Sequence, residues 1–506
     1  MISQYIDRIK RYNLDTASTA PLNAIVSINL SIIDQARHLD AEFRKHKSVK
    51  GRLFCIPVLL KDNIDSFDTP SSSGSLSLMG LEPEKDAVII TRMRNEGALI
   101  LGKTTMDEFA SGLWGISSRS GKTGNAYDPR RNSGGSSAGS AVAISANFSV
   151  LSIGTDNSGS LRIPAAYNGV YTIRSTLGLI SQGGIFPRGN LDGVAGPMAR
   201  TMMDLVIAMD IIAGAPNHSP PYSSYLKKDG LTGKRIGVLR SVNGKDIFQG
   251  RNPEVNDIFA RTIRKLQALS AILVDGIEIS KYNLDRKDNL SGEVEEINTY
   301  LASLPALRLN YEDICRSGLR SDFKGPKECL TFLSTIASKE SSAYKKVIEK
   351  FSSNKQIIES TMDRQKLDAL LLPIDTQGFP DEVGTSDGLQ THVGSNAGLP
   401  GIVLLAGYSS GAISMPVGME LLGRSLNEGL LIEMGYAFEQ AGQHRIPPHV
   451  FENQPGSNKL LGLSLVQLNH LFTRIGWKTF NQVLRTGKRE DLNPDLFRNI
   501  VKDIIQ

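Results

Sequence analysis

Short apolar runs alternate with longer segments of helical periodicity along most of the chain. Runs rich in aliphatic and β-branched residues predict buried strands at 149–155, 234–239, 271–277, 369–373 and 401–407. The segment 425–441, SLNEGLLIEMGYAFEQA, instead repeats its apolar positions every three to four residues, which predicts an amphipathic helix. Strands that alternate with helices favour an α/β fold with a mostly buried sheet.

One region departs from this alternation without any sign of a separate domain. Residues 281–365 are charged and helical in pattern, with polar breaks, and we expect them to form a variable helical cover over one edge of the sheet. The chain has no Pro/Ser linker, low-complexity tract or internal repeat before about residue 450. We therefore expect a single large domain over residues 1–455 that contains this cover.

The pattern changes again beyond Pro455. Residues 459–485 and 494–505 are predicted to be two amphipathic helices, the second capped by Asn493. We expect residues 456–506 to form a helical tail that packs on the domain. A role for this tail as a partner or dimer surface stays open.

Composition places the chain among ordinary soluble globular proteins. Apolar residues make up 40% and charged residues 22%, and the formal net charge is +5. The lysines and arginines are scattered among aspartates and glutamates, without the basic stripe that a nucleic-acid groove needs. No apolar run reaches the length of about 18 residues that a membrane span requires. We expect neither a nucleic-acid partner nor a membrane.

Cysteine usage bears on the compartment. The chain has three cysteines, Cys55, Cys315 and Cys329, far apart in sequence and with no CxxC pair. We expect neither a disulfide framework nor a thiolate metal site, and a reducing compartment follows as the default. The N-terminal residues MISQYIDRIKRYN mix acids into their first turns and lack a signal-peptide apolar core. The sequence therefore predicts a cytoplasmic protein.

Two short motifs suggest chemistry that their surroundings do not favour. Residues 97–104, GALILGKT, match the P-loop pattern, but the aliphatic interior is typical of a buried strand and not of a phosphate cradle. Lys103 is then expected at the surface or in support of a site. Residues 135–139, GSSAG, match a nucleophile elbow centred on Ser137, and histidines do follow downstream. The preceding residues 125–133, NAYDPRRNS, are turn-like, whereas an elbow needs a strand there.

The interval that holds both serine and glycine clusters contains no histidine, because none occurs between His46 and His218. A local base must be another side chain, and the candidate is Lys61, at the end of an apolar run. A neutral amine at pH 7 requires the lysine pKa to fall by roughly 3 to 4, about 4 to 5 kcal/mol, which burial can supply. The alternative is a strand-end lysine whose ammonium reaches water.

Several long motifs occur together in a fixed order. They are IPVLLKDNID (56–65), NSGGSSAGSAVAISAN (132–147), GTDNSGSLRIPAAYNGVYTIRSTLGLIS (154–181) and GPMART (196–201), followed by LDALLLP, NAGLPGI, MPVGMELLGR and GYAFEQAGQHR. Through these motifs the chain closely resembles the amidase signature family over about residues 2–450. The resemblance implies serine amidohydrolase activity and an α/β fold in which helices cover both faces of a large mixed sheet. Within the family, the resemblance leans toward the peptide amidases and general amidases.

The resemblance assigns a Ser-cis-Ser-Lys triad to three positions of this chain. Lys61 matches the family's lysine, Ser136 its bridging serine and Ser160 its nucleophile. Neutral Lys61 would draw the proton of Ser136, which draws that of Ser160 as an acyl-enzyme forms. The family also implies a cis peptide bond between Gly135 and Ser136. No metal or cofactor is expected.

The glycine-rich loop supplies the remaining predicted site residues. The oxyanion hole is assigned to the backbone N–H groups of Asn157, Ser158, Gly159 and Ser160. Supporting positions are assigned to Ser137, Thr155, Asp156 and Arg162. The chain departs from the family where Ser158 and Ala138 replace glycines and where Arg174-Ser175-Thr176 replaces Lys-Pro-Thr. We expect altered loop geometry there and an intact triad.

The predicted function is hydrolysis of a carboxylic acid amide. The expected partner is a small amide or a peptide amide, and the expected oligomeric state is a monomer or homodimer. Two alternatives stay open. One is a glutamine amidotransferase A-type subunit that acts with partner chains, and the other is a catalytically silent family member used as a binding protein.

Overall fold

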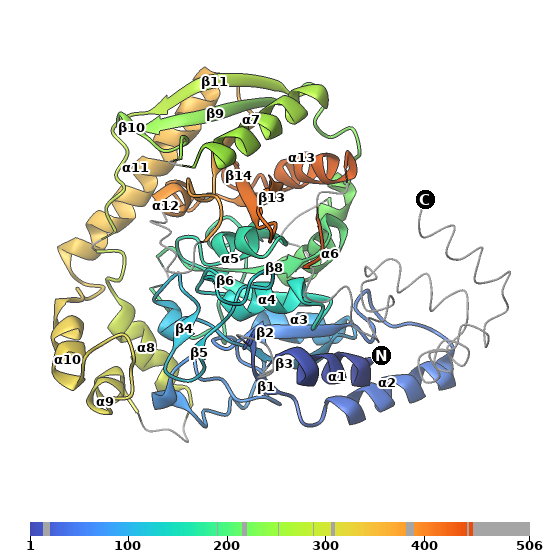
Figure 1. The fold of residues 1–506 in the computed structure, drawn as a ribbon. Coiled ribbons are helices and arrows are strands. Elements are labelled where there is room, and N and C mark those ends of the chain that lie inside the picture. Colours follow the sequence, from blue (N-terminus) through green and yellow to red (C-terminus); the bar gives the residue numbers. More distant parts are fainter. Residues whose placement is uncertain are drawn as a thin grey trace, which may run out of the picture.

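The computed structural model in Figure 1 describes most of the chain up to residue 448. The described ranges are 1–13, 21–189, 191–214, 220–250, 252–286, 288–304, 309–380, 389–442 and 445–448. The predicted tail over 456–506 lies outside these ranges.

A large mixed sheet forms the centre of the described part. Its strands are β1 (Ile25–Ile28), β2 (Pro57–Lys61), β3 (Leu99–Thr104), β6 (Leu151–Asp156), β7 (Tyr171–Arg174), β8 (Val194–Ala199), β9 (Arg235–Val242), β10 (Lys245–Asp246), β11 (Ile272–Ile279), β12 (Ala369–Pro373), β13 (Gly401–Tyr408) and β14 (Pro416–Leu422). They follow the order β1-β3-β2-β6-β8-β7-β13-β14-β12-β9-β10, and β11 pairs with β9. β2 runs parallel to β3 and β6, whereas β6 runs antiparallel to β8. The expected large mixed sheet is confirmed.

Helices cover this sheet, as the apolar pattern predicts. They are α1 (Ile2–Tyr12), α2 (Ile32–His46), α3 (Val88–Asn95), α4 (Ala138–Ser145), α5 (Arg162–Tyr167), α6 (Met202–Ala213), α7 (Pro253–Ala268), α12 (Leu389–Ser395) and α13 (Glu428–Gln440). α4 packs against β2, β3, β6 and β8, and α5 against β7, β13 and β14. α6 packs against β6, β7 and β8, and α13 against β13 and β14. The α/β fold with helices on both faces of the sheet is confirmed.

The strands form where continuous aliphatic runs bury both faces. Every residue of β2, β3, β6 and β12 is buried, as expected for strands inside a covered sheet. β3 includes most of the P-loop-like match, so these residues pair with their neighbours in the sheet and form no phosphate cradle. The short pair β4 (Ile116–Ser117) and β5 (Gly121–Lys122) stands apart from the central sheet.

The segment predicted as a helical cover is helical. It holds α8 (Glu293–Ala302), α9 (Tyr311–Arg316), α10 (Pro326–Thr335) and α11 (Ser342–Arg364). α11 contacts β11, and α8 and α10 both contact α9 at one end of the molecule (Figure 1). No helix in the described ranges has both the length and the apolar character to cross a membrane.

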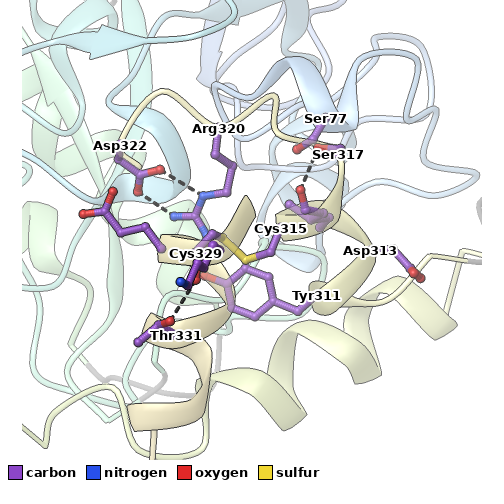
Figure 2. The surroundings of a disulfide bond; sticks show 12 residues. Ser77, Tyr311, Asp313, Cys315, Ser317, Arg320, Asp322, Cys329 and Thr331 are labelled. Atoms are coloured by element: carbon purple, nitrogen blue, oxygen red, sulfur yellow. Dashed lines mark hydrogen bonds and ion pairs between the residues drawn. A yellow bond between two sulfur atoms is a disulfide. The ribbon is translucent and has the colours of Figure 1, made fainter. Parts of the chain in front are cut away.

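The expectation of no disulfide is wrong. Cys315 and Cys329 form a disulfide that joins α9 to α10 (Figure 2), with Cα atoms 5.4 Å apart. Cys55 is buried and free. The pair is 14 residues apart in sequence, and a turn between two short helices brings the two residues together. Arg320 in that turn bonds to Asp322, as Figure 2 shows. Cysteine usage therefore does not support a reducing compartment.

Candidate active site

Lys61 ends β2 and is completely buried. Its Nζ donates to Ser136 Oγ at 2.7 Å and to Thr155 Oγ1 at 2.8 Å. The side chain is 0% exposed, so the alternative of a lysine that reaches water is wrong. Two of the predicted site residues therefore lie within hydrogen-bond distance of this amine.

Burial changes the protonation of this lysine. It lowers the pKa of Lys61 from 10.5 to about 7, although the negative charges of Asp107 and Asp156 oppose the change. A substantial fraction of the amine is therefore neutral at neutral pH. A neutral amine is able to accept a proton, which is what the sequence predicts for this position.

The serine cluster lies in the turn that leads into α4. The peptide bond between Gly135 and Ser136 is cis, as the resemblance implies. No strand runs directly into this turn, since the previous one is β5, so a nucleophile elbow at Ser137 is not formed. Ser137 donates its backbone N–H to the carbonyl oxygen of Ser160 at 3.1 Å. This bond joins the serine cluster of the motif 132–147 to that of the motif 154–181.

Ser160 lies in the loop between β6 and α5 and is 4% exposed. Its hydroxyl forms no hydrogen bond with Ser136 Oγ among the described residues. The structure therefore brings Lys61 and Ser136 into contact and places Ser160 beside them, with its hydroxyl outside hydrogen-bond contact with Ser136.

The loop around Ser160 presents backbone N–H groups. Gly159 donates its N–H to Asp156 Oδ1 at 2.8 Å, so this group is already occupied by a carboxylate. Within the described ranges, the N–H groups of Asn157, Ser158 and Ser160 have no hydrogen-bond partner. Gly159 has a φ of +124°, a conformation that favours glycine, and shapes the loop. Its predicted part in the oxyanion hole is not supported.

A network of buried charged side chains contacts the loop that carries Ser160. Asp156 pairs with Arg162 at 3.1 Å and with Arg174 at 3.0 Å, and Arg162 also pairs with Glu420 at 2.9 Å. Burial alone would raise the pKa of Asp156, but the two guanidinium groups outweigh it and hold this pKa well below the usual range. Asp156 and Arg162 thus bind to each other beneath this loop, and Asp156 also accepts the N–H of Gly159 within it. Arg174, which stands where the family has another residue, contributes directly to the same network.

The remaining predicted supporting residues also contact one another. Ser137 Oγ donates to the carbonyl oxygen of Thr155 at 3.0 Å, and Thr155 Oγ1 lies between Lys61 and Asn63 Nδ2, the latter at 3.2 Å. Lys103 is not at the surface. It is 0% exposed and donates to the carbonyl oxygen of Ile64 and to a nearby serine hydroxyl.

Sequence reasoning missed two residues that contact this site. Thr391, in α12, donates its hydroxyl to the carbonyl oxygen of Ser158 at 2.7 Å. Asp107 donates its backbone N–H to the carbonyl oxygen of Ser136 at 3.2 Å. Asp107 follows β3 closely, and a carboxylate just beyond the end of a buried strand is a signal that the motif analysis did not use.

A small cavity opens beside these residues. Its lining includes Asn63, Thr155, Asn157, Phe186 and Arg188, and its interior has room for about one water molecule. Within the described ranges, no group of histidine, cysteine, aspartate and glutamate side chains could hold a metal ion. The chemistry available here is that of hydroxyls, one amine and backbone N–H groups.

The fold and the position of the site define the class of protein. Lys61 and the Ser160 loop lie at the carboxyl ends of the parallel strands β2 and β6, where α/β enzymes commonly bind substrates. A family model described as Amidase matches residues 1–432. The chain belongs to this family, the amidase signature enzymes, and is an enzyme that acts on C–N amide bonds.

Relatives of two kinds resemble the chain. It is 29% identical to the A subunit of glutamyl-tRNA(Gln) amidotransferase from Thermoanaerobacter pseudethanolicus, over 88% of this chain and 93% of that protein. It is 30% identical to the protein of the same name from Caldanaerobacter subterraneus, over 86% and 91%. Among solved structures, native peptide amidase from Stenotrophomonas maltophilia has a TM-score of 0.76 at 29% identity, covering 88% of this chain and 94% of that one. An amidase family protein from Bacillus anthracis has a TM-score of 0.77 at 28% identity, with 88% of each chain covered.

Proposed function

We propose that the protein hydrolyses a carboxylic acid amide through an acyl-enzyme on Ser160. The observation that carries this proposal is the completely buried Lys61 amine, 2.7 Å from Ser136 Oγ. Burial keeps part of this amine neutral at neutral pH. A base of this kind makes histidine unnecessary.

The proposed reaction consists of acylation and deacylation of Ser160, and in each of them protons pass along the relay of Ser160, Ser136 and Lys61. Neutral Lys61 takes the proton of Ser136, and Ser136 takes that of Ser160 as Ser160 Oγ attacks the amide carbonyl carbon. This step requires the Ser160 hydroxyl to rotate toward Ser136 when substrate binds. The C–N bond then breaks, and the relay runs in reverse to protonate the leaving amine. Water repeats the sequence on the ester and releases the acid.

The developing oxyanion needs hydrogen-bond donors. We propose the N–H groups of Asn157, Ser158 and Ser160 for this role, because Asp156 already occupies the N–H of Gly159. Each well-placed donor contributes about a hundredfold to a thousandfold in rate. The supporting network of Asp156 with its two arginines would keep these donors aimed at one point.

The proposed substrate is a small amide or a peptide amide, in line with the likeness to peptide amidase. The likeness to amidotransferase A subunits favours a second candidate, glutamine hydrolysis within a complex of several chains. For the hydrolase, we propose a monomer or homodimer. The proposed location is the cytoplasm, where the Cys315–Cys329 disulfide would be an exception to the usual reduced state of thiols.

Ammonia release from a panel of amides tests the proposal. The panel contains C-terminal peptide amides, aliphatic amides and glutamine, and the protein is purified as a single chain. We expect turnover by the wild type, its loss in Ser160→Ala, and its retention in Ser149→Ala, a buried serine that bonds to Pro57 at the start of β2. Activity that appears only with partner chains and glutamine would favour the amidotransferase reading. If the folded chain has no turnover under either condition, a silent binding protein is indicated.

A further inference from the structure

Asp107 is a buried carboxylate that the mechanism above does not use. We propose that Asp107 is a positioning residue for the Lys61–Ser136 pair, which fixes the turn that carries Ser136 and sets the pH range of the reaction by its charge. This inference rests on the proposed function.

The carboxylate of Asp107 is fixed from one side by the backbone. It accepts N–H groups from Trp114 at 3.2 Å, Gly115 at 3.0 Å and Ile116 at 3.2 Å. Asp107 is 2% exposed, so water does not compete for these bonds. A side chain held by three donors has little freedom to rotate.

The other side of Asp107 holds the turn that carries Ser136. Its backbone N–H donates to the carbonyl oxygen of Ser136, and its carboxylate packs directly against Gly135. A Cβ atom placed on Gly135 would lie 1.8 Å from Asp107 Oδ2, so no side chain fits there. The position of Ser136, and with it the contact to Lys61, therefore depends on where Asp107 lies.

The charges that face Lys61 come from the two sides of its strand. Asp156, at the end of β6, is balanced by Arg162 and Arg174. On the β3 side, Lys103 makes its own hydrogen bonds and interacts with separate carboxylates, most strongly with that of Asp62.

Asp107 differs from these groups because no ion pair balances it within the described ranges. It forms no ion pair with Lys61 either, so its charge acts on the amine through space. Burial raises the pKa of Asp107 to about 6, which leaves it mostly ionised above that pH. An ionised Asp107 favours the ammonium form of Lys61, and its removal should make the amine neutral at lower pH.

The test compares two substitutions of adjacent buried carboxyl groups. Asp107→Asn removes the charge beside Lys61. Glu108→Gln is the matched control, because Glu108 is also 2% exposed and accepts backbone N–H groups, from Ser118 and Ser321, but is not among the charges that act on Lys61. The measurement is kcat/KM on the best amide of the panel as a function of pH.

We expect the acid limb of the Asp107→Asn profile to move down by roughly one pH unit, with a lower plateau from the disturbed turn. The Glu108→Gln profile should keep the wild-type midpoint. An Asp107→Asn midpoint equal to that of the wild type would overturn the inference and leave a structural role alone. A wild type without an acid limb would instead refute the proposed lysine base, so the two failures are distinguishable.

A folding defect does not prevent the test. If Asp107→Asn does not fold, Asp107→Ser removes the same charge and leaves room for water beside the three N–H groups. The Cε signal of Lys61, assigned by its loss in Lys61→Ala, reports the protonation of the amine directly in an NMR titration. We expect its midpoint to lie at lower pH in the variant without the Asp107 charge than in the wild type. Equal midpoints in the two proteins would overturn the inference.

Discussion

Replacement of Lys61 by methionine should abolish turnover and yet stabilise the fold at neutral pH. Burial lowers the pKa of Lys61 from 10.5 to about 7. In the unfolded chain this lysine is exposed to water and holds its proton up to about pH 10. Folding at neutral pH must therefore either bury the charged ammonium or remove its proton. Either way, the lowered pKa corresponds to a loss of about 4 to 5 kcal/mol in stability, at about 1.4 kcal/mol for each unit by which the pKa falls.

Methionine removes this cost because it carries no charge. The substitution also leaves Ser136 Oγ and Thr155 Oγ1 without the donor that Lys61 provides, at about 1 to 3 kcal/mol. We expect a net gain of about 2 kcal/mol in the free energy of unfolding near pH 7.

The pH dependence of this gain is the diagnostic quantity. Above the folded pKa of about 7, the unfolded wild type binds one more proton than the folded form, so wild-type stability rises with pH. The variant lacks this group, and the difference between the two proteins should shrink by about 1.4 kcal/mol for each pH unit up to about pH 10. Below about pH 7 both wild-type states hold the proton, and the difference should level off.

Urea unfolding of both proteins from about pH 6 to about pH 10 measures this difference. The exposed Lys50→Met substitution is a control that should follow the wild type at every pH. A difference between Lys61→Met and the wild type that stays constant above pH 7 would refute the lowered pKa and, with it, the neutral amine.

Three further changes test the supporting structure. Gly159→Ala should lower kcat by about 100-fold, the effect of one misplaced oxyanion donor. Gly159 has a φ of +124°, and the new Cβ would lie 2.6 Å from Thr391 Oγ1, so the neighbouring N–H groups would shift. An unchanged kcat in steady-state kinetics would contradict this. Glu420→Gln should lower the free energy of unfolding by about 3 to 5 kcal/mol, since it leaves buried Arg162 with one carboxylate partner fewer. A denaturation midpoint equal to that of the wild type would count against this role of the network. Cys315→Ser should lower the free energy of unfolding by about 2 to 4 kcal/mol. A thiol reductant should lower the melting temperature of the wild type but not that of the variant. A wild-type melting temperature that does not change with reductant would contradict the disulfide.

Much of the fold could be predicted from local pattern. The run at 369–373 became β12 without any change of boundary, and 425–441 contains α13. A buried strand in a covered sheet needs only a continuous aliphatic run, which a short window of sequence contains in full. The lysine and serine positions were found for a different reason, because they lie within long motifs that occur in a fixed order.

Contacts between distant segments could not be predicted in this way. Thr391 acts on a carbonyl group 233 positions earlier, and no local pattern marks that contact. For Lys103 the sequence leaves open a surface position or a supporting one, and the structure excludes the surface position, because the Ile64 carbonyl group and a serine hydroxyl accept its hydrogen bonds and allow its burial. The N–H of Gly159 was assigned to the oxyanion hole because the motif does not show where the Asp156 carboxylate points.

The most direct test of the acyl-enzyme on Ser160 is covalent labelling with a fluorophosphonate probe, followed by peptide mapping of the labelled residue. We predict a single adduct on Ser160, absent from Ser160→Ala and strongly slowed in Lys61→Met. An adduct on Ser136 or Ser137, or labelling that persists in folded Ser160→Ala, would contradict the assignment of Ser160 as the nucleophile.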